Sequence, residues 1–436
     1  MLIFMRIGIA VDYGKYANAS SLNLIARKIF LELGKLMNET RTFTISAIKY
    51  EDIGIGDVND HFDVICVPNM GGYRFPHPRA LSSKNLLVGL VGIDEVILGK
   101  NVFKTEEEWK INKPIIEREV PKWEKYVDKI KFVHVSTNSE KEQMIKYLRI
   151  PENKISIIPL GVDHKIFSPP ENKEKTRKQI LGKFFHLDFS YFIHVSEANY
   201  VRKNVFRMLE AFENARANGV EQNLIIVGKT DSVVFDKAKK IPGVILTNYI
   251  AEEDLVMFIQ GADAMIFPSL HEGFGLPPLE AMACGVPVVT SNVYSLPEVV
   301  GDGGLYVDPY NISDIANKIV EISKNQTLRE DLARKALKNS MDYSWGKTAK
   351  MLLNLIKKCP NNDFKNFDFK ECLDLAAYRT LTTVCEITPD LMNTARNDLR
   401  EANYSRIIHW ALEVGLECSN IEDFLIPFKE WLYDHS

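Results

Sequence analysis

Residues 268–309 read PSLHEGFGLPPLEAMACGVPVVTSNVYSLPEVVGDGGLYVDP, and this stretch sets the fold of the chain around it. Glu272 and Glu280, with seven residues between them, enclose a Gly-Phe-Gly loop and a Pro-Pro pair. Residues 277–284 favour a helix that begins at the prolines, and the apolar run 286–290 favours a buried strand. A glycine loop that leads into a helix N-terminus is suited to bind an anion. We therefore expect an anion site with two carboxylates beside it.

Glu280 also has a purely structural interpretation, because it falls in the first turn of the predicted helix. A carboxylate there stabilises the helix by about 0.3–1 kcal/mol through the helix dipole. Glu272 lies before the helix, in a loop where no rule of folding requires a carboxylate. A carboxylate accepts hydrogen bonds from two adjacent hydroxyls, and each charge-assisted bond contributes roughly 1.5–3 kcal/mol. The pair therefore favours binding of sugar and ribose hydroxyls, with phosphates at the loop between them.

Composition excludes several classes of function. With 436 residues, 46% of them hydrophobic, the chain is expected to form more than one globular domain. Its 54 Lys+Arg and 58 Asp+Glu give a net charge of −4, so no nucleic-acid partner is expected. The six cysteines form no C-x-x-C pair, which indicates reduced thiols in a cytoplasmic protein. The N-terminus resembles a first strand more than a signal peptide, and no apolar run is long enough to cross a bilayer. Peripheral contact with a membrane surface stays open.

Buried strands alternate with helices along most of the chain. Strands are expected at residues 3–11, 43–49, 62–68, 86–92, 132–136, 155–159, 191–196, 223–228, 244–248, 264–268 and 286–290. Helices are expected at residues 20–37, 139–148, 202–218, 232–240, 252–260, 277–284, 311–324, 327–340 and 345–358. This alternation predicts an α/β fold with two doubly wound, parallel sheets. Ligands bind at the carboxyl ends of such strands, which places Gly14 and Asp94 at the functional edge.

Three domains are expected: residues 1–167, residues 168–358 and an all-α extension, residues 359–436. Residues 168–188 are polar and contain a Pro-Pro pair, so we interpret them as the interdomain linker. After residue 360 strand patterns are absent, and the helical extension carries no recognisable chemistry. It is a candidate for homo-oligomer formation.

Residues 100–131 are rich in Lys, Glu and Trp. An amphipathic, solvated helix fits them, and Trp109, Trp123 and Tyr126 leave an interfacial aromatic patch as the alternative.

Arg202 and Lys203 open the first helix of the second half, directly after the strand at 191–196. An exposed basic pair is the structural alternative. With the two glutamates at the same sheet edge, we favour a clamp for a diphosphate.

Other motifs are excluded residue by residue. A zinc-protease motif on His271-Glu272 requires a second histidine at position 275, which is glycine. No dinucleotide fingerprint follows the first strand, and the chain has no P-loop sequence and no pair of aspartates separated by one residue. No metal site is predicted.

The segment from Glu272 to Pro277, with Glu280 at its spacing, resembles the E-x7-E signature of the retaining glycosyltransferases of family 4. Residues 281–287, 295–301 and 304–309 also follow that family closely. Residues 158–163 resemble its I-P-x-G-V-D segment, and Arg202-Lys203-Asn204 resembles its R-K-[GN] phosphate clamp. The resemblance is strong over 190–358, weaker over 132–165, and absent after 360.

The resemblance implies a GT-B fold, in which two Rossmann-like domains face each other across a cleft and the last helix crosses back to the first domain. It also implies metal-independent transfer of a hexose, such as mannose or glucose, from a nucleotide-diphosphate sugar to a hydroxyl of a glycan, a lipid-linked acceptor or a protein. The anomeric configuration would be retained, with a donor phosphate oxygen taking the proton of the acceptor. No cofactor other than the donor is implied.

The implied site residues follow from the matched positions. Glu272 would bind the hydroxyls of the donor sugar, Glu280 the ribose, and Arg202 and Lys203 the diphosphate, while Asp94 completes the candidate catalytic set. The remaining donor contacts would come from the backbone of Gly273, Phe274, Gly275 and Leu276, from Tyr249 and Ile250 beside the base, and from Gly14 near the phosphates.

Two departures from the family pattern leave alternatives open. The family often has an arginine where this chain has Glu197 and Ala198, and a histidine where it has Ile93. A GT-B-like binding or scaffold protein without catalysis is therefore the alternative. An epimerase or a phosphorylase on the same fold is a third, less favoured option.

Overall fold

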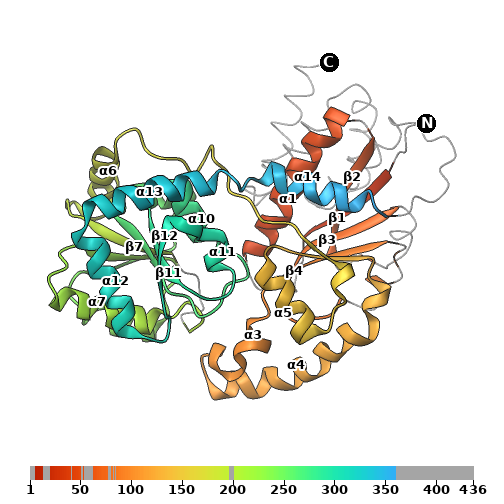
Figure 1. The fold of residues 1–436 in the computed structure, drawn as a ribbon, viewed down its shortest axis with the longest axis horizontal. Coiled ribbons are helices and arrows are strands. Elements are labelled where there is room, and N and C mark those ends of the chain that lie inside the picture. The colour runs from red at the N-terminus through yellow and green to blue at the C-terminus, as the bar shows by residue number, and fades with distance from the viewer. Residues whose placement is uncertain are drawn as a thin grey trace, which may run out of the picture.

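The structure is a computed structural model that describes residues 5–12, 20–40, 42–50, 53, 62–76, 80–81, 83, 85–195 and 201–359. These residues form two α/β lobes that lie side by side (Figure 1). The predicted extension after residue 360, with its proposed oligomer contacts, lies outside the described residues.

The first lobe is built on a six-stranded sheet in the order β2-β1-β3-β4-β5-β6, in which every strand pairing is parallel. Its strands are β1 (Met5–Asp12), β2 (Phe43–Lys49), β3 (Val64–Gly71), β4 (Leu86–Val91), β5 (Phe132–Val135) and β6 (Ile155–Ile157). Strands buried on both faces explain the near-continuous apolar runs in the sequence.

The second lobe has a six-stranded parallel sheet in the order β12-β11-β10-β7-β8-β9. Its strands are β7 (Tyr191–Val195), β8 (Asn223–Val227), β9 (Val244–Asn248), β10 (Ala264–Phe267), β11 (Val288–Ser291) and β12 (Gly304–Val307). The strand order reverses between β7 and β10, and such switch points are where open α/β sheets bind ligands. The sequence analysis missed β12, because its four residues form a half-buried edge strand with no clear pattern.

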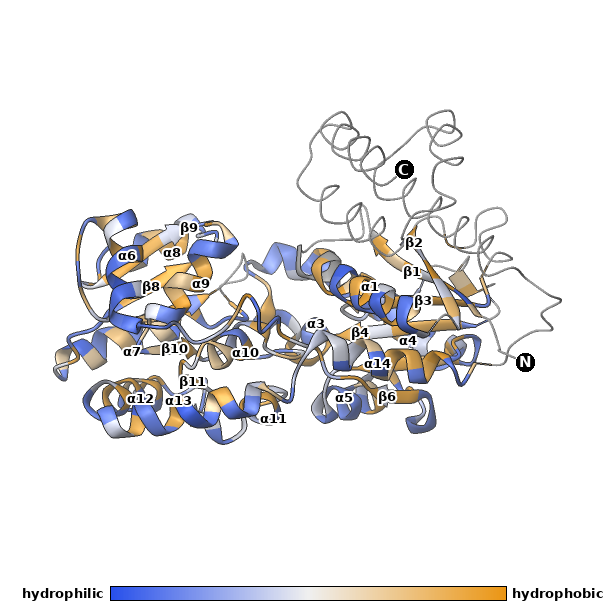
Figure 2. Ribbon diagram, turned by 90° about the horizontal axis from the view of Figure 1, so that it is seen from above, coloured by the Kyte–Doolittle hydropathy of each residue, from blue (hydrophilic) through white to orange (hydrophobic). Residues whose placement is uncertain are grey.

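Helices cover both sheets and present their polar faces to the outside, while the strands carry the apolar core (Figure 2). The α-helices are α1 (Ser20–Thr40), α3 (Asp94–Leu98), α4 (Glu106–Tyr126), α5 (Asn138–Leu148), α6 (Lys173–Phe185), α7 (Val205–Ala217), α8 (Ser232–Ala238), α9 (Glu252–Gly261), α10 (Leu276–Ala283), α11 (Leu296–Val300), α12 (Ile312–Lys324), α13 (Gln326–Ser340) and α14 (Trp345–Ile356). Short 3-10 helices are η4 (Gly99–Val102), η5 (Val127–Lys129), η6 (Glu152–Lys154) and η7 (Gly301–Gly303).

Residues 168–188, predicted as the interdomain linker, mostly form helix α6, which packs against α9 of the second lobe. Asn172 caps this helix by accepting a hydrogen bond of 2.9 Å from the backbone N–H of Lys175. Ile180 and Leu181 are fully buried, and Arg177 donates to the carbonyl of Gly261 at 2.8 Å. Three of its lysines, Lys175, Lys178 and Lys183, are exposed on the outer face, whereas Lys173 is half-buried near Asp263.

Helix α4 carries the three aromatic residues, Trp109, Trp123 and Tyr126, that were considered as an interfacial patch. Trp123 is fully buried, its Nε1 donates to the Tyr73 carbonyl at 2.9 Å, and its ring meets Phe75 edge to face. Trp109 packs against Phe103. The three aromatic side chains therefore do not form one exposed surface, and α4 is an amphipathic helix packed on the first lobe.

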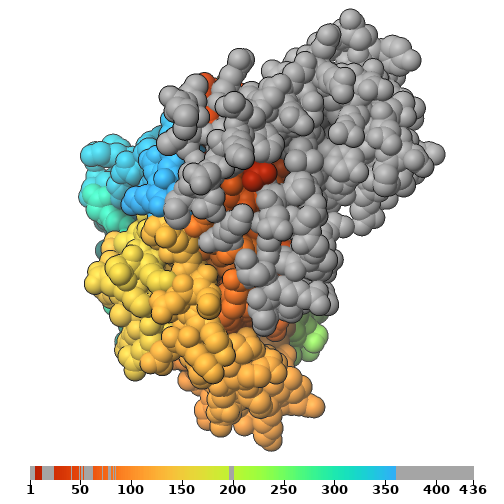
Figure 3. Space-filling model, turned by 90° about the vertical axis from the view of Figure 1, so that its right-hand side faces the viewer, coloured from red at the N-terminus to blue at the C-terminus, as the bar shows by residue number. Residues whose placement is uncertain are grey.

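The chain crosses back to the first lobe at its last described helix. Helix α14 packs against α1 (Figure 1), and on the face shown in Figure 3 the blue residues of α14 lie beside the yellow and orange residues of the first lobe. Thr348 of α14 donates to the Pro159 carbonyl at 2.7 Å. The backbone of Gly161 lies directly against Ser344 and Trp345, where a Cβ would stand 2.1 Å from the Trp345 nitrogen. The chain passes between the lobes twice, near residue 161 and again near residues 344–345, and these two segments are packed on each other.

Two further findings concern the described part of the chain. None of its helices is both long and apolar enough to span a bilayer. Its three cysteines, Cys66, Cys284 and Cys359, are buried and free.

Candidate functional site

The candidate catalytic residues follow three strand ends. Arg202 and Lys203 come after β7, and Glu272 comes after β10, which is paired with β7 in the same sheet. Asp94 comes after β4 of the other lobe and is the first residue of α3. Because parallel strands point the same way, Arg202, Lys203 and Glu272 lie at the same edge of the second sheet. This edge faces the first lobe.

The structure brings all four side chains into one charged cluster. Lys203 Nζ lies 2.7 Å from Glu272 Oε1, and Arg202 Nη1 lies 3.1 Å from Glu272 Oε2. Arg202 Nε lies 3.4 Å from Asp94 Oδ2, so the guanidinium joins the two lobes. Glu272 and Lys203 are each only 7% exposed. Arg202 and Lys203, which were predicted to bind the diphosphate, therefore form ion pairs with Glu272, which was predicted to bind the sugar.

Burial and charge act in opposite directions on these groups. Burial alone would raise the pKa of Glu272, but the charges of Arg202 and Lys203 outweigh it and lower the pKa to about 2. Burial lowers the pKa of Lys203, with the charge of Arg202 adding to this effect and the charge of Glu272 opposing it. Glu272 thus stays ionised at physiological pH, and its negative charge stabilises the charged forms of Arg202 and Lys203.

The loop after Glu272 is shaped by two glycines. A Cβ on Gly273 would lie 2.6 Å from Glu140 Oε1 and 3.0 Å from the Gly92 nitrogen, so glycine lets this loop touch the first lobe. Gly275, the N-cap of α10, has φ +104°, which favours glycine. Ser295 Oγ donates to the Glu272 carbonyl at 2.7 Å and fixes the loop. The backbone from Gly273 to Leu276 therefore enters α10 in one defined conformation, with the Phe274 side chain packed inward against Tyr343.

Glu280 does not lie in the first turn of its helix. Helix α10 begins at Leu276, one residue before the two prolines, so Glu280 falls in its second turn. The helix-dipole explanation for this carboxylate is therefore wrong. Burial, together with the charge of Glu252 at the start of α9, raises the pKa of Glu280 to about 7, and Lys203 opposes the shift.

The predicted base-flanking loop follows β9, in the same region as Glu252. Tyr249 is 79% exposed, whereas Ile250 is half-buried against the core. Neither residue forms a hydrogen bond or ion pair with the charged cluster in the described part of the chain, so their predicted role beside the base stays a prediction.

Glu140, at the start of α5, is a site residue that the sequence analysis missed. It accepts hydrogen bonds from the backbone of Gly92 at 2.9 Å and of Ser136 at 2.8 Å. Burial raises the pKa of Glu140 to about 7, although these hydrogen bonds oppose the shift. Glu140 Oε1 lies 2.6 Å from where a Cβ on residue 273 would stand, so this side chain supports the loop after Glu272 from the first lobe. A glutamate three residues after Thr137 matched an ordinary capping pattern, so no sequence signal distinguished it.

His271 and Asn138 also join the lobes. His271 Nε2 lies 3.0 Å from Gln143 Oε1, and the Asn138 backbone donates to Glu298 at 2.9 Å. Sequence reasoning considered His271 only as a zinc ligand. In the described part of the chain, no cluster of three or more His, Cys, Asp or Glu side chains is arranged to hold a metal ion.

Two sequence expectations at this edge fall outside the described residues: Gly14, and the departures at Glu197 and Ala198. Ile93, which stands where the family often has a histidine, is fully buried in the core of the first lobe. Asp94 is thus the polar residue that the end of β4 contributes to the charged cluster.

Comparison with known proteins places this geometry in context. A sequence profile described as "Glycosyl transferases group 1" matches residues 177–339. O-antigen chain mannosyltransferase B of Escherichia coli is 29% identical over 240 residues, covering 53% of this chain and 61% of that protein. The chain therefore spans about three fifths of the length of this relative.

Solved structures share the fold at low sequence identity. Sucrose-phosphate synthase from Thermosynechococcus elongatus superposes with a TM-score of 0.58 at 16% identity, covering 82% of this chain and 98% of that one. The Anabaena protein HepE in complex with UDP-glucose gives a TM-score of 0.58 at 14% identity, covering 81% of this chain and 99% of that one. The two lobes of this chain form a GT-B fold, as the resemblance to the family 4 glycosyltransferases implied.

Proposed function

We propose that the protein is a glycosyltransferase that moves a hexose from a nucleotide-diphosphate sugar to an acceptor hydroxyl, with retention of anomeric configuration. The observation that carries this proposal is the charged cluster of Arg202, Lys203, Glu272 and Asp94, assembled from both lobes at the switch point of the second sheet. The profile match, the mannosyltransferase relative and the fold shared with a UDP-glucose complex support it.

The cluster suits a reaction whose leaving group is a diphosphate. Rupture of the anomeric carbon–oxygen bond builds negative charge on that group, and preorganised cations lower the energy of such a transition state. Lys203 and Arg202 supply the positive charge, and Glu272 holds them in place before the donor arrives. Because side chains supply this charge, we propose that the reaction needs no metal ion.

Glu272 is better suited to orient groups than to attack the sugar. Each of its oxygens already faces a cation, Lys203 at 2.7 Å and Arg202 at 3.1 Å. A carboxylate engaged in this way is a weak nucleophile. This supports a mechanism in which a donor phosphate oxygen, rather than Glu272, takes the proton of the acceptor as the new bond forms on the same face.

The donor is proposed to extend from the cluster along α10. The N–H groups that begin this helix, from Gly273 to Leu276, are suited to bind sugar and phosphate oxygens. Glu280 is proposed to accept from the ribose hydroxyls, with Tyr249 and Ile250 beside the base. Mannose is the favoured sugar, because the E. coli relative is a mannosyltransferase.

A panel of GDP-, UDP- and ADP-hexoses tests the function, with calorimetry for binding and release of the nucleoside diphosphate for turnover. Glu272→Ala is the control and is expected to turn over none. The alternative, a binding or scaffold protein, is favoured by Ile93, which buries an apolar side chain at the histidine position. If wild-type protein binds no nucleotide, the proposed transfer is ruled out, and the result favours a binding or scaffold protein.

We expect nucleotide affinity to rise as the pH passes through 7. The pKa of Glu280 is raised to about 7, chiefly by burial, so the carboxylate is largely protonated below that pH and ionised above it. An ionised carboxylate accepts stronger hydrogen bonds from ribose hydroxyls. Affinity should gain about tenfold between pH 6 and 8, and Glu280→Gln should remove this dependence.

Two neighbouring substitutions control this measurement. Glu252→Gln removes the charge that adds to burial at Glu280, so the rise in affinity should move to lower pH. Glu253→Gln, one residue further along α9, should leave the pH profile unchanged. An affinity that does not vary with pH in the wild-type protein would show that Glu280 does not bind the ribose.

A further inference from the structure

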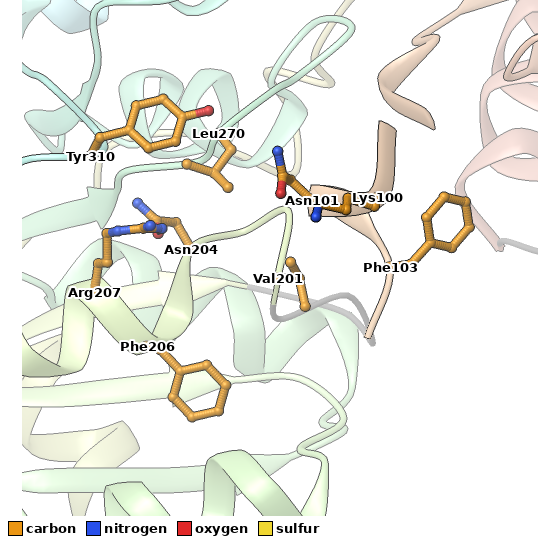
Figure 4. Close-up of a pocket in the computed structure, with 9 residues that line it drawn as sticks. All are labelled: Lys100, Asn101, Phe103, Val201, Asn204, Phe206, Arg207, Leu270 and Tyr310. Carbon is orange, nitrogen blue, oxygen red and sulfur yellow. The ribbon is translucent and has the colours of Figure 1, made fainter. Parts of the chain in front are cut away.

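A pocket of about 510 Å³ is lined by residues of both lobes (Figure 4). Lys100 and Asn101 of η4 line it from the first lobe. Asn204, Arg207 and Tyr310 line it from the second lobe. None of the residues to which the sequence analysis assigned a donor contact lines this pocket.

Two cations, Lys100 and Arg207, line the pocket. Among the described residues, no carboxylate lies within ion-pair distance of Lys100 or Arg207. Three neighbouring cations do have carboxylate partners: Lys104 pairs with Asp231, and Arg202 and Lys203 pair within the charged cluster. Two cations that face one pocket from opposite lobes are expected to attract an anion.

Arg207 is held ready for such an anion. Its guanidinium carbon lies 5.4 Å from the centroid of the Tyr310 ring, and its Nη1 donates to Asn204 Oδ1 at 2.9 Å. Asn204 is itself fixed, because its Nδ2 donates to the carbonyls of Pro268 at 3.0 Å and Pro309 at 2.6 Å. A guanidinium has five N–H donors in a planar fork, so donors remain for a phosphate or carboxylate.

The rest of the lining suits a saccharide. Tyr310 is 56% exposed, which leaves its ring accessible. Figure 4 shows Tyr310, Leu270 and Asn204 gathered on one side of the pocket, with the carboxamide of Asn101 opposite them. Aromatic and apolar surface with a few placed polar groups is the usual lining of a small-molecule site.

The pocket and the charged cluster share a wall. Val201 and Leu270 line the pocket. Val201 is followed in the chain by Arg202, and Glu272 lies two residues after Leu270; both Arg202 and Glu272 belong to the charged cluster. The Leu270 N–H donates to the Arg202 carbonyl at 2.8 Å, which ties the two segments together. A ligand in the pocket therefore lies next to the proposed reaction centre.

We propose that this pocket binds the phosphate group of a phosphate-bearing saccharide, which is the acceptor of the transfer reaction. The assignment rests on the proposed function for the word acceptor. A phosphomonoester carries about two negative charges at neutral pH, which matches the two cations that have no carboxylate partner among the described residues. Lys100 and Arg207 bind the phosphate, and Tyr310 and Asn101 bind the sugar.

Calorimetry on the full chain tests the pocket without any donor present. The probes are mannose 6-phosphate, mannose and inorganic phosphate. Mannose 6-phosphate should bind at least tenfold more tightly than either of the other two. Lys100→Gln and Arg207→Gln should each weaken it by about tenfold, since each removes a charge-assisted contact. Lys110→Gln, which changes an exposed lysine of α4, should not.

Several results would overturn the proposal: no binding of mannose 6-phosphate, binding unaffected by Lys100→Gln and Arg207→Gln, or an equal loss in Lys110→Gln. Inorganic phosphate binding as tightly as the sugar phosphate would reduce the pocket to a bare anion site and would also overturn it. Thermal melting of each variant checks that it is folded. Binding of the sugar phosphate without turnover of any donor would refute the proposed transfer instead, so the two failures are distinguishable.

Discussion

Glu272→Gln is expected to lower the free energy of unfolding by about 3–5 kcal/mol and to abolish turnover of a nucleotide sugar. Glu272 is the charge partner of the buried Lys203, and its neutralisation also removes the carboxylate that lies 3.1 Å from Arg202 Nη1. Breaking a buried ion pair leaves an uncompensated charge, which is the physical origin of the loss. Urea unfolding at pH 7 measures it.

The loss should shrink in acid. The pKa of Glu272 in the folded protein is lowered to about 2, below the ordinary value of 4.5. Its stabilising contribution is therefore fully present above about pH 4.5 and is lost as the pH falls toward 2. Unfolding at pH 3 should show a smaller difference between wild-type protein and Glu272→Gln than unfolding at pH 7.

A double variant separates stability from activity. Lys203→Met combined with Glu272→Gln removes both charges of the pair, so most of the lost stability should return while turnover stays absent. Glu152→Gln breaks the exposed pair with Lys141 and should leave stability unchanged within error. A Glu272→Gln protein as stable as wild type would mean that the ion pair is not the buried interaction described here.

Gly161→Ala is expected to cost about 3 kcal/mol of stability and to reduce transfer, because it forces apart the two crossings between the lobes. The added Cβ would lie 2.1 Å from the Trp345 nitrogen and 2.2 Å from the Ser344 carbonyl carbon. Those are backbone atoms, which cannot rotate away as a side chain can. Thermal melting and donor turnover measure the two effects.

Gly182→Ala is the matched control for this prediction. Gly182 lies within α6, and a Cβ there would meet no atom within 4 Å. Alanine favours a helix over glycine by up to about 1 kcal/mol, so this variant should melt at the wild-type temperature or slightly above it. If Gly161→Ala melts together with Gly182→Ala, residues 161 and 344–345 are not in the close contact described.

The order of strands and helices was predictable because buried parallel strands leave near-continuous apolar runs. Helix α6 was not, since its few buried side chains, Ile180 and Leu181, lie in a segment rich in lysine. Edge strand β12 was missed for a related reason: half-buried residues leave a weak pattern.

For the candidate site, local motifs identified the residues but not their pairing. The E-x7-E pattern and the basic pair singled out Glu272, Arg202 and Lys203. That Glu272 forms ion pairs with both cations depends on the pairing of β7 with β10, which lie far apart in sequence. The pocket lined by Lys100 and Arg207 could not be predicted, because it depends on how the two lobes are placed, which no local sequence pattern encodes.

The most direct test of the proposed transfer is the rate of nucleoside diphosphate release from a nucleotide hexose by wild-type protein and by the Lys203→Met/Glu272→Gln double variant, assayed under conditions where both are folded. The proposal predicts turnover of at least one donor by the wild-type protein and none by the double variant. Equal rates for the two proteins, or no release from any donor by the wild type, would contradict it.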